Sequence, residues 1–483
     1  MEINFEKCMQ LSDALIDEIK LDLKSWGKES DEEILDSILI YLGLYEIHKV
    51  GKQNSNSNSL QILKEYLKSF GYIGKVFSEY FKRKIRSKKL NQELNTNKKF
   101  IICQSFHKKI FNENVLPIFI NENINNYHEV LVTSDRIQGL RGEYPEFPIH
   151  LRSIPLLRWY FLRKQINTNK ILKKLFHVNN FSSYMQLATI LNWLFFYYLP
   201  CLEVLLLAVK HFTENNCVTF SISADQADPK GRLLNQYFYK IGVPTYIIQQ
   251  GLTSKKYLDW YDCKATKIFV MDNRQSMLIH NQGVNLNSIC ITGAVWLDNK
   301  HSPINKKKNL ILLGTQPFVQ GAFASRKNML KTVERIIGIL YKNKSTLSNQ
   351  IEKICIKVHP SENYLDYGFL LKKFPCLEIS DGMSEISELL DQTLVYCTFT
   401  SQTSLLAINK GIPVINLLFP QLVLENSILE ELRFFETKKV QNLEEFEITI
   451  KDIFKTMVHN EKINSKNHLR GIENIRNFLI NNT

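Results

Sequence analysis

The chain alternates between two patterns of apolar positions. Over residues 1–95, apolar side chains recur three and four positions apart, as in "LSDALIDEIKLDLKSW" and "DEEILDSILIYLGLYEIHKV", and this spacing predicts amphipathic helices. Short apolar runs that end in polar residues begin with "KKFIICQSF" (98–106) and "HEVLVTSD" (128–135). Such runs are typical of parallel strands buried on both faces. The pattern predicts a helical N-terminal extension followed by an α/β domain.

The next stretch, from about 149 to 212, returns to helical spacing. Its most apolar part is "TILNWLFFYYLPCLEVLLLAVK", which carries Asn192, Pro200 and Glu203 near its middle. A lone membrane-spanning helix tolerates such residues poorly. We therefore predict two buried helices joined at Pro200.

Strands and helices then alternate regularly. Residues 217–253 have the pattern strand, loop, helix, turn, strand, and a similar unit follows at 265–294. Pro303 and a lysine run interrupt the pattern, so 295–309 is predicted to be an interdomain linker. A second alternating set starts at "LILLGT" (310–315). The predicted architecture is α/β, with two facing Rossmann-like domains and a helical N-terminal extension. The predicted segments are 1–95, helical extension; 96–295, N-terminal domain with a helical insertion; 305–460, C-terminal domain; and 461–483, C-terminal helix.

Composition sets the class of protein and its partners. The chain has 483 residues, of which 44% are hydrophobic and 23% charged, as expected of a folded protein with more than one domain. Its formal charge of +13 favours anionic partners. The basic stretches at 82–99, 163–174 and 304–309 lack interleaved aromatic residues, and no helix-turn-helix or finger signature occurs, so nucleic acid is not expected. Those stretches are either a solvated basic face or a means of attraction to the inner leaflet of a membrane.

The cysteines and the N-terminus bear on location. The nine cysteines show no CxxC or Cys/His pairing, which indicates reduced thiols and no zinc site. The first residues, "MEINFEKCMQ", lack the pattern of a signal sequence. A cytoplasmic location, peripheral on the inner face of the membrane, is therefore expected.

Polar residues cluster after one predicted strand of the first domain, in "VTFSISADQADPKGR". Asp225 is a candidate general base or nucleophile. Asp228 is a second such candidate, but Asp228 followed by Pro229 also fits a helix N-cap. Arg232 adds positive charge or lies on the surface. Because no DxD element or second acidic cluster appears, no metal is expected.

A further strand of the first domain ends in "YIIQQGLT". Gly251 allows close approach of a ligand to the backbone, and Gln250 offers neutral hydrogen bonds. A glycine after a strand is also the usual mark of a simple turn.

Two strand ends of the second domain suggest an anion site. Pro360 stops the strand "KICIKVHP" and leaves His359 at its tip, where an imidazolium could pair with phosphate. Lys357 adds positive charge or is a surface residue, and Gly314 opens a glycine-containing loop after the first strand of this domain. The segment "TSQTSLLAINKG" opens a helix, and a helix start with hydroxyls can bind an anion. The ordinary interpretations are a structural histidine and an N-cap by Ser401. The hydroxyl candidates are Thr400, Ser401, Thr403 and Ser404.

These motifs, in this order, resemble those of bacterial GT-B glycosyltransferases that build capsule, lipopolysaccharide or other surface glycans. The pairing of an HP motif with a later Ser/Thr motif is similar to the CMP-sugar-using branch, which includes sialyltransferases and Kdo transferases. That resemblance implies that the CMP phosphate is held by His359, Pro360 and the hydroxyls of Ser401, Thr403 and Ser404.

The resemblance also implies that a carboxylate of the first domain acts on the acceptor or the sugar. The chain departs from the family pattern twice. Many relatives have QHG where this chain has Gln249–Gln250–Gly251, and the acidic D/E-D/E-G motif is reduced to "SDGM" at 380–383. The catalytic carboxylate is therefore open among Asp225, Asp228 and Asp135, the last next to Arg136 in "TSDRIQGLRGE".

The expected function is a glycosyltransferase that needs no metal and no cofactor beyond its nucleotide-sugar donor, expected to be CMP-linked, and uses a glycan or lipid-linked acceptor. Three alternatives stay open at this point. They are a CDP-polyol phosphotransferase of the teichoic-acid type, a nucleotide-hexosamine epimerase, and a non-enzymatic assembly scaffold.

Overall fold

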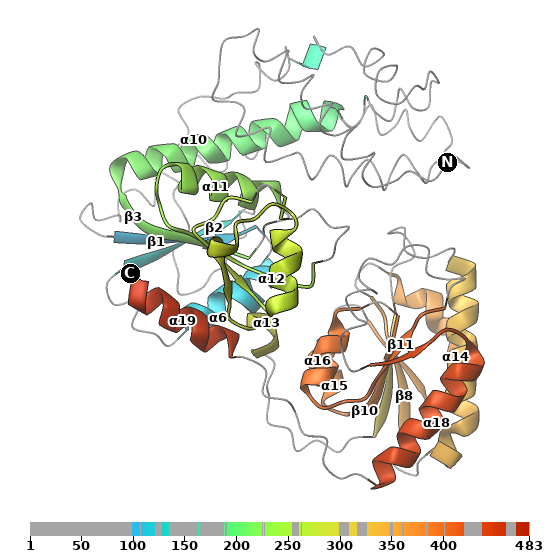
Figure 1. The fold of residues 1–483 in the computed structure, drawn as a ribbon. Helices are drawn as coiled ribbons and strands as arrows, with labels where there is room; N and C mark the ends of the chain where they lie inside the picture. The colour runs from blue at the N-terminus through green and yellow to red at the C-terminus, as the bar shows by residue number, and fades with distance from the viewer. Residues whose placement is uncertain are drawn as a thin grey trace. The chain divides into compact units, whose positions relative to one another are not determined.

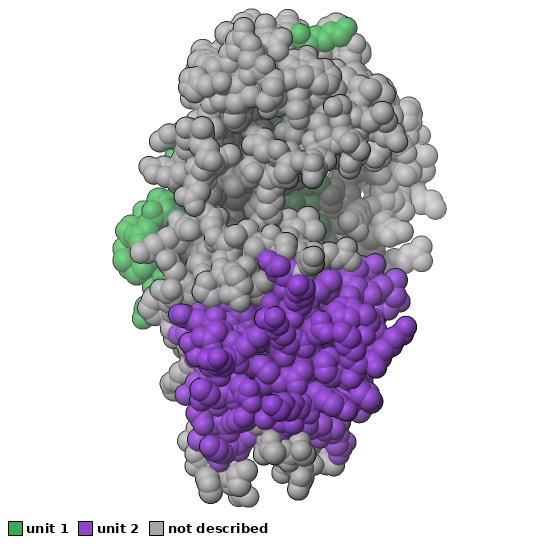
Figure 2. Space-filling model, turned by 90° about the vertical axis from the view of Figure 1, so that its right-hand side faces the viewer, with its two compact units in different colours: residues 1–250, 258–293, 472–483 green, residues 251–257, 294–471 purple. Residues whose placement is uncertain are grey.

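The chain divides into two compact units, which Figure 2 colours separately. Unit 1 consists of residues 1–250, 258–293 and 472–483, and unit 2 of residues 251–257 and 294–471. The predicted extension 1–95 and nearly all of the three basic stretches lie outside the described residues. The computed structural model describes residues 99–106, 108–120, 128–134, 163–164, 188, 191–224, 226, 228–253, 260–261, 263–298, 309–315, 326–347, 351–359, 362–381, 385–399, 401–419, 437–459 and 470–482.

Unit 1 is built on a six-stranded parallel sheet with the order β2-β1-β3-β4-β5-β6. Its inner strands are mostly apolar and buried, in keeping with a sheet covered on both faces, whereas the edge strand β6 is partly exposed. The strands are β1 (Lys99–Ser105), β2 (His128–Ser134), β3 (Cys217–Ser223), β4 (Thr245–Ile248), β5 (Lys267–Val270) and β6 (Ile289–Ile291). The helices are α5 (Lys108–Ile110), η2 (Phe111–Val115), α6 (Leu116–Phe119), η5 (Leu194–Tyr198), α10 (Leu199–Asn215), α11 (Pro229–Lys240), α12 (Asn273–His280), η6 (Leu286–Ser288) and α19 (Gly471–Asn482).

The prediction of two helices joined at Pro200 is wrong. Leu191–Asn215 is one helical run, and the proline is accommodated by the π-helix η5, in which the N–H of Leu199 donates to the carbonyl of Leu194. A proline offers no N–H and its ring would collide with the carbonyl four residues back, so the wider π turn carries the helix past it. The same arrangement occurs at Pro117. There too a π-helix, η2, comes directly before a Leu-Pro dipeptide, Leu116–Pro117.

The run Leu191–Asn215 is long and apolar enough to cross a membrane by length and composition. Most of it is buried inside unit 1, however, and Phe212 packs edge-on against Phe100 of β1 at a ring distance of 5.3 Å. Core helices of globular proteins meet the same two criteria, and this helix covers one side of the sheet together with α11 (Figure 1).

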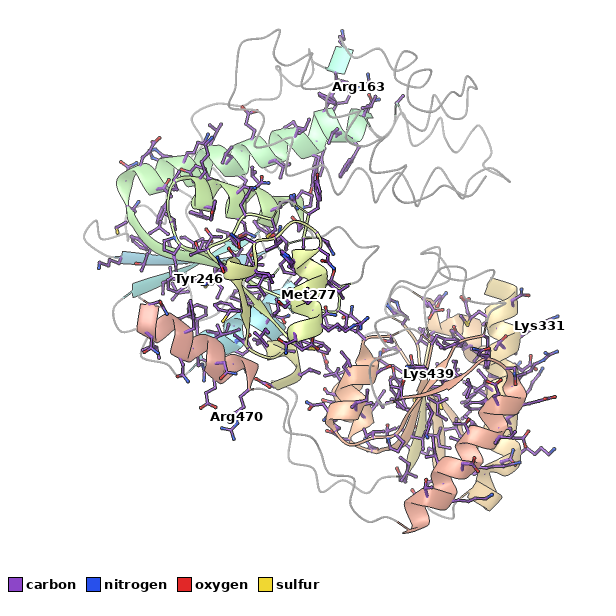
Figure 3. All side chains as sticks on the ribbon, viewed as in Figure 1. Arg163, Tyr246, Met277, Lys331, Lys439 and Arg470 are labelled. Atoms are coloured by element: carbon purple, nitrogen blue, oxygen red, sulfur yellow. The ribbon has the colours of Figure 1, made fainter. Side chains whose placement is uncertain are left out.

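The C-terminal helix α19 belongs to unit 1 and lies on the other side of its sheet (Figure 1). Phe478 packs edge-on against Tyr246 of β4 and Phe269 of β5, at ring distances of 5.8 and 5.3 Å. Tyr246 lies inside the unit (Figure 3). The Arg476 guanidinium donates to three backbone carbonyls at the end of α6, those of Pro117, Ile118 and Ile120. A chain segment more than 350 residues away in sequence thus caps α6.

Unit 2 contains a second parallel sheet with the order β12-β11-β10-β7-β8-β9. Figure 1 shows α14 and α18 on one side of this sheet and α15 and α16 on the other. The strands are β7 (Leu310–Gly314), β8 (Lys353–Lys357), β9 (Leu377–Ser380), β10 (Thr393–Thr398), β11 (Val414–Leu417) and β12 (Lys438–Val440). The helices are α13 (Val295–Asp298), α14 (Arg326–Leu347), η7 (Tyr364–Leu370), α15 (Ile386–Leu390), α16 (Thr403–Asn409) and α18 (Leu443–His459).

The prediction of a linker over 295–309 fails at its beginning. Val295, Trp296 and Leu297 are buried in α13, and the side-chain amide of Asn409 donates to the carbonyl of Leu297 at 3.5 Å. Burial of three successive large apolar residues stabilises this segment. The sequence pattern did not indicate the helix, because a proline and a lysine run follow it. The fold class itself, two Rossmann-like α/β domains, is confirmed by the two parallel sheets.

Eight cysteines fall among the described residues, and all are free thiols. Burial raises the pKa of Cys103 and of Cys397, so neither thiol ionises readily. The predicted role of these residues as reduced core side chains is confirmed for Cys103, Cys263, Cys355 and Cys397.

Candidate functional site

The strand order of unit 2 locates its ligand-binding edge. Counted along the chain from β7, the strands lie in the order 3-2-1-4-5-6, so the connections diverge between β7 and β10. In open parallel sheets, ligands bind at the carboxyl ends of the strands at such a switch point. The strand ends that meet there carry Gly314 and Thr315 after β7, His359 after β8, and Ser401 and Thr403 after β10.

The loop after β8 is fixed by a carboxylate that sequence reasoning missed. Glu362 accepts hydrogen bonds from the hydroxyls of Thr315 and Tyr367 and, at 3.3 Å, from the backbone N–H of His359. The same N–H donates to Thr315 at 2.9 Å, and the N–H of Glu362 returns to the carbonyl of His359 at 2.9 Å. His359 is thus held at the strand tip through its backbone, and its imidazole is half-buried.

The Glu362 carboxylate has an unusual environment for a charged group. Burial raises its pKa above the ordinary value, and the hydrogen bonds from Thr315, Tyr367 and His359 oppose that shift only in part. Its partner Tyr367 is fully buried, and burial together with the neighbouring carboxylate raises the pKa of that phenol. Glu362 is thus a half-buried acceptor that fastens the ends of β7 and β8 and the helix η7 to one another.

Hydroxyls form the other side of the site. The Tyr396 hydroxyl lies 2.6 Å from the Thr403 hydroxyl, which lies 2.7 Å from that of Ser401. Ser401 also accepts the backbone N–H of Thr403 at 3.2 Å. A hydroxyl has one donor and two acceptor sites, so with Tyr396 as donor both acceptor sites of Ser401 are filled. The remaining capacity of Ser401 is then one O–H donor, which suits an anion.

Gly314 is required by the packing of this cluster. A Cβ at Gly314 would lie 2.5 Å from the Tyr396 hydroxyl oxygen and 3.2 Å from the Thr398 hydroxyl oxygen. Those atoms are buried, so a side chain would displace the ring that begins the hydroxyl chain. Gly314 therefore serves the site through Tyr396.

Gly251 meets a side chain where the sequence predicted a ligand. A Cβ at Gly251 would lie 2.5 Å from the amide oxygen of Gln402, and the Gln402 amide donates to the carbonyl of Leu252 at 3.5 Å. Both glycine and glutamine belong to unit 2. The close approach expected of Gly251 is therefore made by the residue between Ser401 and Thr403.

Comparisons with known proteins give a fold-level likeness. Neither family models nor curated protein sequences match the chain. Among solved structures, the UDP-GlcNAc 2-epimerase of Methanocaldococcus jannaschii is 12% identical and has a TM-score of 0.47, with 80% of this chain and 99% of that chain covered. A UDP-GlcNAc 2-epimerase of Neisseria meningitidis bound to UDP-GlcNAc is 12% identical, with a TM-score of 0.45 and coverage of 80% and 98%. The calicheamicin glycosyltransferase CalG4 is 9% identical, with a TM-score of 0.43 and coverage of 80% and 98%. Similarity at this level does not indicate a shared activity.

Two of the predicted phosphate ligands have other partners. Ser404 is fully buried and donates to Asn416 of β11 at 3.2 Å, because a residue one position after Thr403 faces another side of the helix. Lys357 is buried, not a surface residue, and its ammonium donates to the carbonyl of Asp381 after β9. Gln402 occupies the N-cap position of α16 but its side chain makes no capping bond, and Ser401 caps the N–H of Thr403 from one residue further out. Pro360 and Thr400 lie outside the described residues.

The candidates of unit 1 are placed in part. Asp228 caps α11, with its carboxylate accepting the N–H of Lys230 at 2.8 Å, and the cap interpretation is confirmed. Arg232 is buried and its guanidinium donates to the carbonyl of Tyr261, so it is not a surface residue. Gln250 is half-buried at the end of β4. Asp225, Asp135 and Arg136 lie outside the described residues.

A buried polar network lies at the switch point of unit 1, between β1 and β3. The Gln104 amide donates to Ser221 at 3.0 Å and to Asn235 of α11 at 2.7 Å. Asn235 in turn donates to Gln226 at 3.0 Å and so holds the loop that follows β3. The period-two pattern of the strands gives no signal for this network, because all of its members are fully buried polar residues.

The described residues hold no group of three His, Cys, Asp or Glu side chains that suits a metal ion. The donors gathered at the switch point of unit 2 are an imidazole and hydroxyls. β8 and β10 both neighbour β7, so their ends are about 10 Å apart by ordinary strand spacing. That span suits an anion held from both sides.

Proposed function

We propose that the chain is a nucleotide-sugar-dependent glycosyltransferase whose donor phosphate binds at the switch point of unit 2. The observation that carries the proposal is the convergence of His359 and the Ser401–Thr403 hydroxyls on the ends of strands that flank β7. Both groups are anchored, His359 by the half-buried Glu362 and the hydroxyls by the buried Tyr396. Fixed donors of this kind stabilise charge that develops on a leaving phosphate.

We propose CMP-linked ulosonic acids, such as Kdo or sialic-acid-like sugars, as donors. The support is the pairing of the HP motif with hydroxyls from the start of α16. A monophosphate link also fits a site that offers one imidazole and the hydroxyls of Ser401 and Thr403. His359 would neutralise the departing CMP, and no metal would be needed in that role.

The acceptor would bind unit 1, with Asp225 as general base or nucleophile. Asp228 is the weaker candidate for that role because its carboxylate already caps α11. Gln226 lies between these two aspartates in sequence and accepts a hydrogen bond from Asn235, which in turn accepts one from Ser223 of β3. These bonds connect the loop to the sheet. The acceptor is proposed to be a glycan or lipid-linked glycan of a bacterial surface polysaccharide.

Binding calorimetry with CMP, CDP, UDP, GDP and dTDP tests the donor site. We expect selective binding of CMP, a loss of about tenfold or more in affinity for His359→Ala, and wild-type binding by the control variant His211→Ala, a histidine of α10. The backbone N–H of His359 makes the hydrogen bonds to Thr315 and Glu362, so the alanine variant retains those two contacts. Binding of no nucleotide by folded protein would overturn the proposal.

Product analysis separates the neighbouring activities. Incubation with a CMP-ulosonate and a glycan acceptor should give a glycosidic product. Preference for UDP, with interconversion of a free UDP-hexosamine in the absence of acceptor, would identify an epimerase instead. Transfer of a polyol phosphate from a CDP donor would identify a phosphotransferase.

A further inference from the structure

Exposed apolar side chains are concentrated on one short helix of unit 2. Four large ones lie within eight residues, on η7 and the residue after it: Tyr364, Leu365, Phe369 and Leu371. Leu365 is 66% and Leu371 47% exposed. In a 3₁₀-helix, residues three apart lie in one row, and Leu365 and Leu371 share an outer row while Tyr367 and Leu370 are fully buried. The helix is therefore apolar on its buried side and also carries large apolar side chains that are exposed to solvent.

This apolar side continues onto a basic helix. Lys373, just after η7, pairs with Glu334 of α14 at 2.5 Å, and Phe374 contacts the half-exposed ring of Tyr341 at a centroid distance of 5.5 Å. Lys331 projects from the outer side of α14 (Figure 3). Residues 326–347 and 362–374 together contain eight lysines and arginines and three acidic residues. One of the three, Glu362, accepts hydrogen bonds within the candidate site.

We propose that this η7–α14 surface docks on an anionic lipid bilayer. The surface comprises the four apolar side chains, Tyr341, and the basic residues Arg335, Lys342, Lys372 and Lys373. Large apolar side chains exposed on a surface helix can enter the boundary between headgroups and acyl chains, and neighbouring lysines bind the lipid phosphates.

The composition favours a bilayer over a protein partner. Lysine is depleted in protein–protein interfaces, whereas this surface is rich in lysine and leucine. Asp366 is the acidic residue of η7, and it is half-buried. The proposal does not depend on the nucleotide site, because vesicle binding is measured without nucleotide.

Flotation with vesicles tests the proposal on the full chain. We expect the protein to float with phosphatidylcholine vesicles that contain about a third phosphatidylglycerol, to remain behind with pure phosphatidylcholine, and to be released by salt. The double variant Leu365→Ser/Leu371→Ser should lower the bound fraction at least about fivefold, because both apolar contacts are lost. Lys342→Gln/Lys372→Gln should weaken binding to the anionic vesicles as well.

Matched controls come from α18 of the same unit. Ile448 is 62% exposed and Lys455 is an exposed lysine, so Ile448→Ser and Lys455→Gln remove similar groups elsewhere and should bind like wild type. All of these side chains are exposed, and the circular dichroism of each variant should match wild type. Failure of the wild-type protein to float, or equal losses in the controls, would overturn the proposal. So would light scattering that shows a dimer abolished by the leucine variant without any flotation, since the surface would then join two copies of the chain.

Discussion

Replacement of Glu362 tests the anchoring of the donor site directly. In Glu362→Ala, the Tyr367 hydroxyl is fully buried and loses its acceptor, and the Thr315 hydroxyl loses its shorter contact. A buried donor without a partner costs about 1–3 kcal/mol, so the two together cost roughly 2–6 kcal/mol. The His359 N–H keeps its 2.9 Å bond to Thr315, so we expect the lower half of that range.

Hydrogen exchange of the peptide 353–362 measures this effect where it arises. A loss of about 2 kcal/mol raises the local opening constant about 30-fold. Glu362→Gln should cost less than the alanine variant by about 1 kcal/mol, because the amide oxygen still accepts from Thr315 and His359 and only the Tyr367 hydroxyl loses its acceptor. Glu388→Ala, an exposed glutamate of α15, is the control. Wild-type exchange in the alanine variant would refute the anchoring role of Glu362.

The same carboxylate predicts a pH dependence with a definite sign. Burial raises its folded pKa above the ordinary glutamate value of 4.5, so the folded state binds the proton more tightly than the unfolded state does. Stability from this group is therefore complete below about pH 4.5 and declines as pH rises through the folded pKa. Glu362→Gln should remove that decline from the urea midpoints of unit 2 above pH 4.5. An unchanged pH profile in the glutamine variant would show that Glu362 titrates normally.

Three further variants test other parts of the two units. Gly314→Ala should lower the melting temperature by an amount equivalent to about 1–3 kcal/mol, because the new Cβ clashes with the Tyr396 hydroxyl. Adding Tyr396→Phe to this variant should recover part of the loss. Full stability of the single variant would refute the packing argument. Arg476→Ala should release α19 from unit 1, because three carbonyls at the end of α6 lose their charged donor. Tryptic cleavage before Gly471 should then be faster, and unchanged cleavage kinetics would show that Arg476 does not hold α19 in place. Asp228→Ala should destabilise unit 1 by about 1 kcal/mol in urea unfolding while Asp228→Asn does not, and equal loss in both variants would point to a role for its charge.

The fold could be predicted because buried parallel strands are long apolar runs. β7, β8 and β10 are visible in the sequence for this reason, and the polar residues after them mark the carboxyl edge of the sheet. The two errors, at Pro200 and at 295–298, arose where a local signal was overridden by packing. A π turn absorbs the proline, and burial of three apolar residues makes a helix out of an apparent linker.

The candidate site could be predicted only at the level of strand ends. Glu362 was missed because its role depends on Thr315, which lies 47 residues away. The inward direction of Ser404 depends on where α16 begins, and a shift of one residue turns a side chain by about 100°. The contact of Gln402 with Leu252 spans 150 residues and has no local signature. Long-range contacts of this kind decide which polar residues are left to bind a ligand.

The return of α19 to unit 1 has a consequence for synthesis on the ribosome. Residues 294–471 all belong to unit 2, and they are made between Gly293 and the helix that covers Tyr246 and Phe269. At ordinary translation rates this interval lasts roughly 10–40 s. During that time the sheet of unit 1 has an uncovered aromatic face, while unit 2 gains all of its strands. Unit 2 can therefore complete its folding first, although unit 1 begins earlier, and nascent unit 1 is the part of the chain with most need of a chaperone.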